Sequence, residues 1–274
     1  MFKHQKRDGL LVGVMFIQLA LIILPFLFEL SLSSLVFLVI VNTFLIGTNY
    51  QCVAHNFIHN PFFKHTLINQ IFSILNTLCI GIPQSIYKIH HLEHHRHNNN
   101  PAKDVSSTFK YGKNGKEENI FLYSTLGVLR TDMVALCKVA RKQSLLINFE
   151  IISLSIFIAI LCLLNWQLFI GYILTSYLFG QFFALWENYC EHNHANFNDR
   201  KRDSVSCYNS IYNLVWFNNG FHQEHHYSPT IHWTKIAEVK AKLPQDRKVV
   251  NFCHLSNSFS KKSLPLTLIT KSHS

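Results

Sequence analysis

Charged residues are scarce in this chain, and four long apolar segments, Leu10–Phe28, Leu30–Ala54, Leu145–Leu164 and Gln167–Trp186, contain none except Glu150. Only 15% of the 274 residues are Asp, Glu, Lys or Arg, whereas 49% are hydrophobic. This balance excludes an ordinary soluble domain, because each segment is long enough to cross a hydrocarbon core of about 30 Å. We therefore predict an all-α integral membrane protein with four transmembrane helices, at about residues 10–28, 31–53, 145–164 and 167–187.

The first apolar segment follows Lys3, Lys6 and Arg7, as a secretory signal peptide would. It is longer than the apolar core of a signal peptide and lacks a small-residue cleavage site, so we predict a retained span. The connectors Glu29–Leu35 and Asn165–Gln167 contain none of the 25 Lys and Arg residues. By the positive-inside tendency, both termini and the long polar segments are predicted to be cytosolic.

Paired cysteine motifs and nucleic-acid-binding motifs are also missing. The seven cysteines are scattered without metal-binding spacing, so we expect reduced, mostly buried thiols. The net charge is +10, but the basic residues are dispersed, with no helix-turn-helix or finger motif to direct them at nucleic acid. Lipid headgroups or an acidic protein are the expected partners of these charges. No oligomeric state is predicted.

The polar segments are predicted to form a helical cap on the cytosolic side, within a single domain of residues 1–274. The apolar stretch 67–86 contains several polar residues, Gly81 and Pro83, and is expected to lie in the interface or to re-enter the membrane. Residues 119–142 have an amphipathic pattern, which fits a helix on the membrane surface or one packed on its own protein. The tail, 256–274, is expected to be flexible.

Histidine is abundant, with 17 residues, and three clusters have helical spacing: His55-x3-His59, His91-x2-His94-His95 and His222-x2-His225-His226. Such spacing places the imidazoles of each cluster on one helix face. Imidazole nitrogen is a common ligand of first-row metals, and eight histidines exceed the needs of one ion. His192 lies six residues beyond Trp186, at the depth expected for His55. The sequence thus predicts a two-metal site of nine histidines.

These motifs resemble those of the membrane fatty acid desaturase and hydroxylase superfamily. The segment Trp216–His226, followed by Pro229 and His232-Trp-Thr, is similar to bacterial desaturase-domain proteins. The resemblance implies four spanning helices beneath a cytosolic cap, and localisation in a bacterial inner membrane. It also implies two iron ions, with O2 as co-substrate. The ligands implied are His55, His59, His91, His94, His95, His192, His222, His225 and His226.

Several neighbouring residues could support these ligands. Asn188, four residues before His192, matches a position where some family members hold a metal-bound water, although a capping or packing role is the alternative. Carboxylates could orient the imidazole N–H groups, and the candidates are Glu93, Asp104, Glu191 and Glu224. Four further histidines are expected to lie outside the ligand set: His90, His97, His194 and His232.

The resemblance implies an oxidoreductase that acts on lipid acyl chains, with desaturation as the first hypothesis. Hydroxylation or ketone formation on a lipid, an alkane or a carotenoid is the alternative within the superfamily. The chain contains no electron-carrier segment, so a separate ferredoxin, cytochrome b5 or rubredoxin is expected. Residues 200–202, Arg-Lys-Arg, could dock an acidic carrier or form a solvated loop.

Three other classes of function were weighed against this hypothesis. A zinc protease is suggested by His90–His94, which fits HxxEH, but His55-Asn56 lacks the Glu of HExxH. A metal transporter would hold its ligands within the spans, whereas these histidines follow the span ends. A non-catalytic membrane protein that binds metal or lipid remains open, because a ligand set does not prove turnover.

Overall fold

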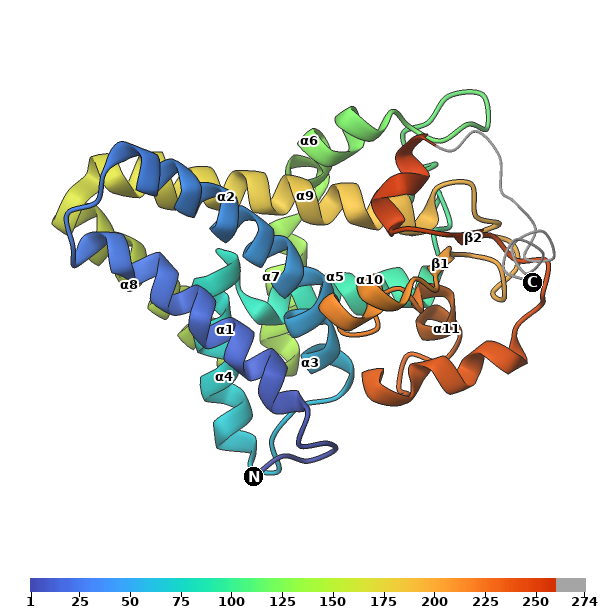
Figure 1. Cartoon of the computed structure of the whole chain (residues 1–274), viewed down its shortest axis with the longest axis horizontal. Coiled ribbons are helices and arrows are strands. Elements are labelled where there is room, and N and C mark those ends of the chain that lie inside the picture. The colour runs from blue at the N-terminus through green and yellow to red at the C-terminus, as the bar shows by residue number, and fades with distance from the viewer. Residues whose placement is uncertain (260–274) are drawn as a thin grey trace. The chain divides into compact units, whose positions relative to one another are not determined.

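The computed structural model describes residues 1–259, which are mostly helical (Figure 1). Strands β1 (Ser206–Cys207) and β2 (Val249–Val250) form a two-stranded parallel sheet. The helical elements, with η for 3-10 or π turns, are α1 (Asp8–Ile23), η1 (Leu24–Phe26), α2 (Leu32–Thr48), η2 (Asn49–Ala54), α3 (His55–His59), α4 (Thr66–Ile80), α5 (Gln84–His97), α6 (Ile120–Arg130), α7 (Met133–Gln143), α8 (Leu146–Leu168), η3 (Phe169–Leu174), α9 (Thr175–His192), α10 (Ser210–Val215), α11 (His222–Tyr227), η4 (Trp233–Lys242) and η5 (His254–Phe259).

The chain divides into two compact units. The first contains residues 1–91 and 132–184, and the second contains residues 92–131 and those from 185 onward. Helices α5 and α9 each contribute to both units. The predicted flexible tail began at residue 256, but residues 256–259 belong to η5, and the rest of that tail lies outside the described residues.

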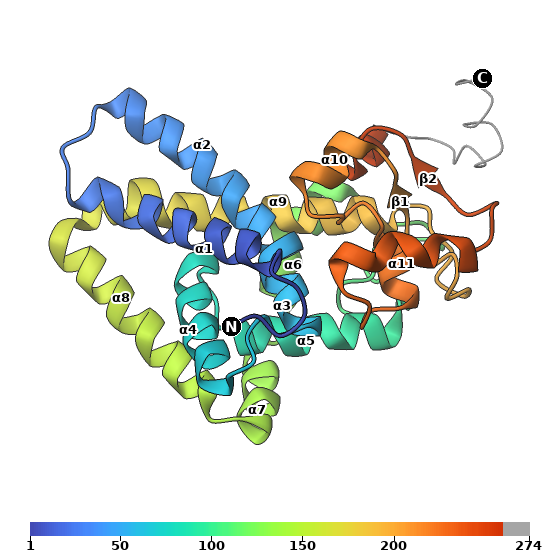
Figure 2. The same cartoon turned by 60° about the horizontal axis from the view of Figure 1, so that its bottom comes forward.

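Three helical segments in the described part of the chain are long and apolar enough to cross a membrane: Asp8–Phe26, Leu32–His59 and Leu146–His192. The number rises to five if each of two bent helix pairs is one span. At 1.5 Å per residue, the 47 residues of the third segment extend about 70 Å, more than twice a hydrocarbon core. Asn165 interrupts this segment with extended backbone (φ −164°, ψ 96°), and α8 and α9 run in different directions (Figure 2).

The two helices predicted in the polar segments are each broken. Instead of one helix over 67–86, α4 ends at Ile80 and α5 begins at Gln84, with a bend of 88° between them. Gly81 makes this end possible, because its φ of +74° is left-handed and a Cβ would lie 2.9 Å from the Tyr177 ring. Instead of one helix over 119–142, α6 stops at Arg130, and the Asp132 side chain caps α7.

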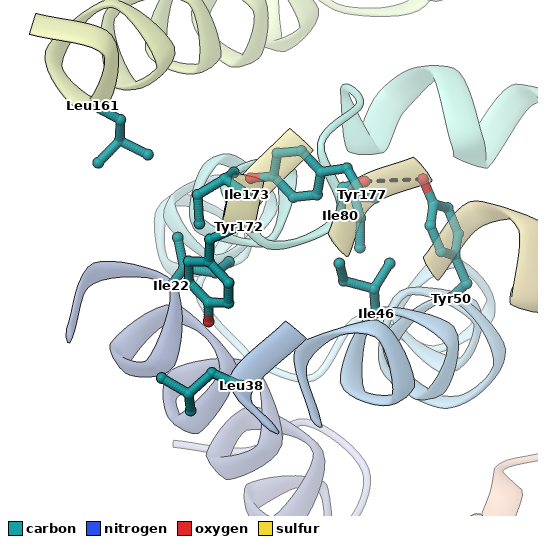
Figure 3. Close-up of a cluster of buried hydrophobic side chains, with 9 residues drawn as sticks. All are labelled: Ile22, Leu38, Ile46, Tyr50, Ile80, Leu161, Tyr172, Ile173 and Tyr177. Carbon is teal, nitrogen blue, oxygen red and sulfur yellow. Dashed lines mark hydrogen bonds between the residues drawn. The ribbon is translucent and has the colours of Figure 1, made fainter. Parts of the chain in front are cut away.

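The end of α4 lies inside the first unit, where its terminal carbonyl groups need hydrogen-bond donors. Each of the last three carbonyls accepts a bond from a side chain of another helix: Leu78 from Tyr177, Cys79 from Gln18 at 3.0 Å, and Ile80 from Tyr50 at 3.1 Å. The bond from Tyr50 to Ile80 is drawn in Figure 3. A helix end away from water is stable only when such partners exist. These three donors therefore allow α4 to stop within the unit.

Four buried amide side chains continue this polar network through the first unit. The Asn49 Nδ2 donates to Gln18 Oε1 at 2.7 Å and to Asn76 Oδ1 at 2.8 Å, and Asn76 Nδ2 donates to Gln84 Oε1 at 2.9 Å. Each amide is at most 2% exposed. Because unpaired buried amides are costly, the network specifies one arrangement of α1, η2, α4 and α5.

A carboxylate completes the attachment of the α4–α5 pair to α8. Glu150, the charge in the third predicted span, is fully buried. Its Oε1 accepts a hydrogen bond from the Ser73 hydroxyl at 2.6 Å, and its Oε2 accepts one from the Ser85 N–H at 3.0 Å. Ser85 lies in the first turn of α5, where N–H groups lack helical partners and negative charge is favourable. Glu150 thus anchors the start of the helix that bears His91.

Apolar packing between α2, η3 and α9 surrounds these polar contacts in the first unit. Figure 3 shows the buried cluster, which comprises Ile22, Leu38, Ile46, Tyr50, Ile80, Leu161, Tyr172, Ile173 and Tyr177. Gly47 and Gly180 allow α2 and α9 to approach closely, since a Cβ at Gly180 would lie 2.5 Å from Ile46 Cβ. Small residues at helix contacts are common in membrane proteins for this reason.

We expect Gly180→Ala to destabilise the protein by about 1–3 kcal/mol, because Ile46 Cβ cannot move without its backbone. Gly13→Ala in α1 is the matched control, since a Cβ there meets no atom within 4 Å. Alanine favours a helix over glycine, so the control should unfold at the same or a higher temperature. Thermal unfolding of both purified variants in detergent tests this contrast. Equal effects of the two substitutions would contradict the packing argument.

Candidate metal centre

Three of the nine predicted ligands lie together in the first unit. His55 and His59 occupy α3, which directly follows the π turn η2 at the end of α2, and His91 lies on α5. The Nε2 atoms of His59 and His91 are 2.8 Å apart, and the rings of His55 and His91 have centroids 4.4 Å apart. The structure therefore brings together the ligands of the first motif and one from the second.

The other six predicted ligands lie in the second unit, at the end of α5, the end of α9 and on α11. The Nε2 of His192 lies 3.0 Å from that of His94 and 3.3 Å from that of His222. The His95 and His225 Nε2 atoms are 2.9 Å apart. His226 lies among them, with its ring centroid 4.4 Å from that of His95 and 4.7 Å from that of His192.

The hydrogen-bond partners of the Nδ1 atoms of His192 and His94 show which nitrogen of each ring carries the proton. The Nδ1 of His192 lies 2.9 Å from the backbone carbonyl of Asp203, which can only accept, so this nitrogen carries the proton. The Nδ1 of His94 lies 2.7 Å from the Asp104 carboxylate and donates to it in the same way. In the neutral imidazoles, both Nε2 atoms are then lone-pair acceptors, only 3.0 Å apart. Two neutral acceptors at this distance repel each other unless a proton or a metal ion lies between them.

His226 provides a second indication that the set fits a metal ion. It is fully buried, and neither ring nitrogen has a hydrogen-bond partner among the described residues. Burial, followed by the neighbouring imidazoles, lowers the pKa of His226 well below its ordinary value. A buried, neutral imidazole is the form that ligates a metal, and one ring nitrogen of His226 is available for it. Ligand atoms of His94, His192 and His226 lie within 4.8 Å of one another, which suits one first-row ion.

Asp104, one of the predicted orienting carboxylates, is well placed for that role. It is buried and accepts N–H bonds from Ser106 at 2.8 Å and Asn99 at 2.9 Å, in addition to His94. Burial alone would raise the pKa of Asp104, but His94 and the Ser106 N–H lower it below its usual range. The carboxylate is therefore ionised, and it holds the His94 ring with Nε2 directed at His192.

We expect Asp104→Asn to weaken metal retention by about 10–100-fold, the usual effect of losing a carboxylate that orients a ligand. Glu93→Gln is the matched control, because Glu93 lies beside His94 in the sequence but is exposed and pairs with Arg96 and His97. Titration of each purified variant with a chelator, followed by metal analysis, measures the difference. A wild-type titration curve for Asp104→Asn would remove Asp104 from the centre.

The remaining predicted carboxylates have different partners. Glu191 Oε1 lies 3.5 Å from His222 Nδ1, as an orienting group would. Glu224 instead accepts from Ser206, Tyr208 and Arg247, and so joins β1 to the segment before β2. The sequence analysis missed a further carboxylate, Asp203, which follows no recognisable motif. Its Oδ1 is 3.9 Å from His226 Nδ1, and burial raises its pKa to about 7.

Asn188 and two of the extra histidines have hydrogen-bond or ion-pair partners outside the nine predicted ligands. The Asn188 Nδ2 donates to the Tyr123 hydroxyl at 2.6 Å. None of the four extra histidines belongs to a ligand group in the described residues; His97, for example, pairs with Glu93, and His194 with Glu117. In the segment 200–202, which was predicted to dock an acidic carrier or to form a solvated loop, Arg202 forms ion pairs with Asp199 and Asp246.

Comparison with known proteins agrees with the arrangement of these motifs. The sequence profile described as fatty acid desaturase matches residues 30–251. A relative described as sphingolipid delta(4)-desaturase DES1-like, from Arabidopsis thaliana, is 27% identical over 198 residues, which cover 70% of this chain and 58% of the relative. The sphingolipid delta(4)-desaturase DES1 of Drosophila melanogaster is 28% identical over 217 residues, or 72% of this chain and 62% of the relative.

The chain spans about three fifths of the length of these two curated relatives. No solved structure matches it. The profile nevertheless covers residues 30–251, from before α2 to just after β2, and it includes all nine histidines of the two units. The chain belongs to the fatty acid desaturase family.

Proposed function

We propose that this protein is an O2-dependent diiron oxidoreductase that desaturates the acyl chain of a membrane lipid. The nine histidines would hold two iron ions, one of them on the set formed by His94, His192, His222 and His226. When bound, the irons supply the oxidising power to remove hydrogen from an unactivated carbon chain, with O2 and two external electrons. A sphingolipid is the first substrate class to test, because the two relatives are described as sphingolipid desaturases.

The observation that carries the proposal is the pair of acceptor nitrogens on His94 and His192. Their Nδ1 protons are committed to Asp104 and to the Asp203 carbonyl, so in the neutral rings the two Nε2 lone pairs face each other at 3.0 Å. A metal ion relieves this repulsion and uses both lone pairs. The desaturase family then supports iron over other first-row metals. In this role, the second unit binds the ion and orients its ligands through buried acceptors.

We further propose a topology of four spans, in which α1, α2, α8 and α9 cross the membrane and the α4–α5 pair re-enters it. The bend at Asn165 supports two crossings within Leu146–His192, and the charge distribution supports cytosolic termini and a cytosolic metal site. A bacterial inner membrane would suit this arrangement. Electrons would come from a separate ferredoxin, cytochrome b5 or rubredoxin, and Asn188 would contribute through a metal-bound water.

Metal analysis and lipid mass spectrometry together test the proposal. Purified protein should contain about two irons per chain, as nine imidazole ligands require. Cells expressing the wild type should accumulate a lipid lighter by two hydrogen atoms, and cells expressing His225→Ala should not. A gain of one oxygen atom would instead indicate a hydroxylase. Stoichiometric zinc, or unchanged lipids together with full iron content, would contradict the proposed activity.

A further inference from the structure

A buried group of two carboxylates and one histidine lies in the second unit beside the predicted ligands. Glu187 and Glu191 are one turn apart on α9, and His254 begins η5 near the end of the described chain. All three side chains are at most 1% exposed. The His254 Nδ1 lies 3.5 Å from Glu187 Oε1 and 3.4 Å from Glu191 Oε1. No sequence motif draws attention to His254.

Glu191 connects this group to a ligand of the metal centre. One atom, Glu191 Oε1, lies 3.4 Å from His254 Nδ1 and 3.5 Å from His222 Nδ1. The same oxygen accepts a hydrogen bond from Asn219 Nδ2 at 2.8 Å. On the other side of the ring, His222 Nε2 lies 3.3 Å from His192 Nε2. The carboxylate therefore lies between His254 and the ligand His222.

Two carboxylates buried so close together would repel each other without a nearby positive charge. His254 is the basic side chain that faces both of them. Burial alone would lower the pKa of His254, but the two carboxylates raise it to about 9, which favours the imidazolium. The Tyr212 hydroxyl donates to Glu187 at 2.5 Å and lies 3.1 Å from His254 Nδ1, so it bridges the two groups.

We propose that His254 is a positioning residue of the metal centre, which acts through Glu191 to hold the ring of His222. His254 keeps the Glu191 oxygen beside His222 Nδ1, and that contact directs His222 Nε2 toward the metal. In this way η5, which is distant in sequence from every histidine motif, becomes part of the ligand support. The inference rests on the proposed metal centre but not on the reaction catalysed.

The test compares His254→Ala with Asn257→Ala, a matched change on the same helix. Asn257 is also fully buried and joins η5 to the end of α9, where its amide donates to the carbonyls of Cys190 and Asn193 and not to Glu191 or His222. Both variants should lose thermal stability. His254→Ala alone should lose iron to excess chelator about 10-fold faster or more and show an altered Mössbauer spectrum. His254→Gln, which keeps a hydrogen-bond donor, should recover much of the retention.

Three results would overturn the proposal. The first is a wild-type rate of iron loss and a wild-type spectrum for His254→Ala. The second is an equal change in Asn257→Ala, because a general loosening of η5 would then explain both variants. The third is a third metal per wild-type chain that disappears in both His254→Ala and Glu187→Gln, since the group would then be a ligand site itself. Wild-type protein that contains no metal would contradict the proposed function itself. Wild-type protein that holds its metal independently of His254 would contradict this inference alone.

Discussion

His226→Ala is expected to reduce metal retention and the proposed desaturase turnover by more than about 100-fold, which exceeds the usual effect of losing an orienting group. His226 is fully buried, and neither ring nitrogen has a hydrogen-bond partner in the described structure, which supports its proposed role as a metal ligand. Alanine removes a ligand and leaves a cavity in its place. Metal analysis of the purified variant and lipid mass spectrometry of expressing cells measure the two effects separately.

His194→Ala provides the control for this prediction. His194 lies two residues beyond the ligand His192, but its side chain is 45% exposed and pairs with Glu117. Its removal should leave the metal content and the product unchanged. If His226→Ala retained two metals per chain, His226 would not be a ligand and the proposed set in the second unit would be wrong. Thermal unfolding in detergent would show whether a loss of metal reflects a loss of the ligand or of the fold.

Asn76→Leu is expected to lower stability by about 2–6 kcal/mol, because it leaves two buried amides, those of Asn49 and Gln84, without one partner each. Leucine has the same branched skeleton as asparagine, so the substitution leaves no cavity and the loss comes mainly from hydrogen bonding. For a chain of this size, the temperature of unfolding should fall by roughly 5–20 °C.

Gln70→Leu removes an amide from the same helix at a half-buried position and serves as the control. It should change the unfolding temperature little. Since Asn76 also joins α4 to the start of α5, iron retention should decline in Asn76→Leu even though the residue is not a ligand. An unfolding temperature equal to that of the control would show that the amide network contributes nothing measurable.

Local patterns in the sequence predicted the helical class and the composition of the histidine groups. The apolar segments and the i, i+3, i+4 spacing of His91, His94 and His95 depend only on neighbours along the chain. Gly81 and Pro83 counted against a membrane crossing by residues 67–86, but the break between α4 and α5 was not predicted. The exact break depends on Tyr177, which lies nearly one hundred residues away and is not visible as a partner in the sequence.

The residues around the ligands were less predictable, because their roles arise from long-range contacts. Asp104 and Glu191 were among the candidates only because they lie near histidines in the sequence. Glu93 satisfied the same criterion but faces outward, where it pairs with Arg96. Asp203 and His254 follow no motif, and only folding brings them beside His226 and Glu191. Buried charge is decided by tertiary packing, which a single sequence does not display.

The side-chain donors at the end of α4 also bear on how the protein is assembled in the membrane. The carbonyls of Leu78, Cys79 and Ile80 depend on Tyr177, Gln18 and Tyr50, which belong to three other helical segments. Tyr177 lies on α9, which leaves the ribosome long after α4. Before α9 arrives, the end of α4 lacks one of its donors and is costly to bury in lipid. In the proposed topology, the α4–α5 pair would therefore enter the bilayer after translation of α9, and biogenesis would not follow the order of the sequence.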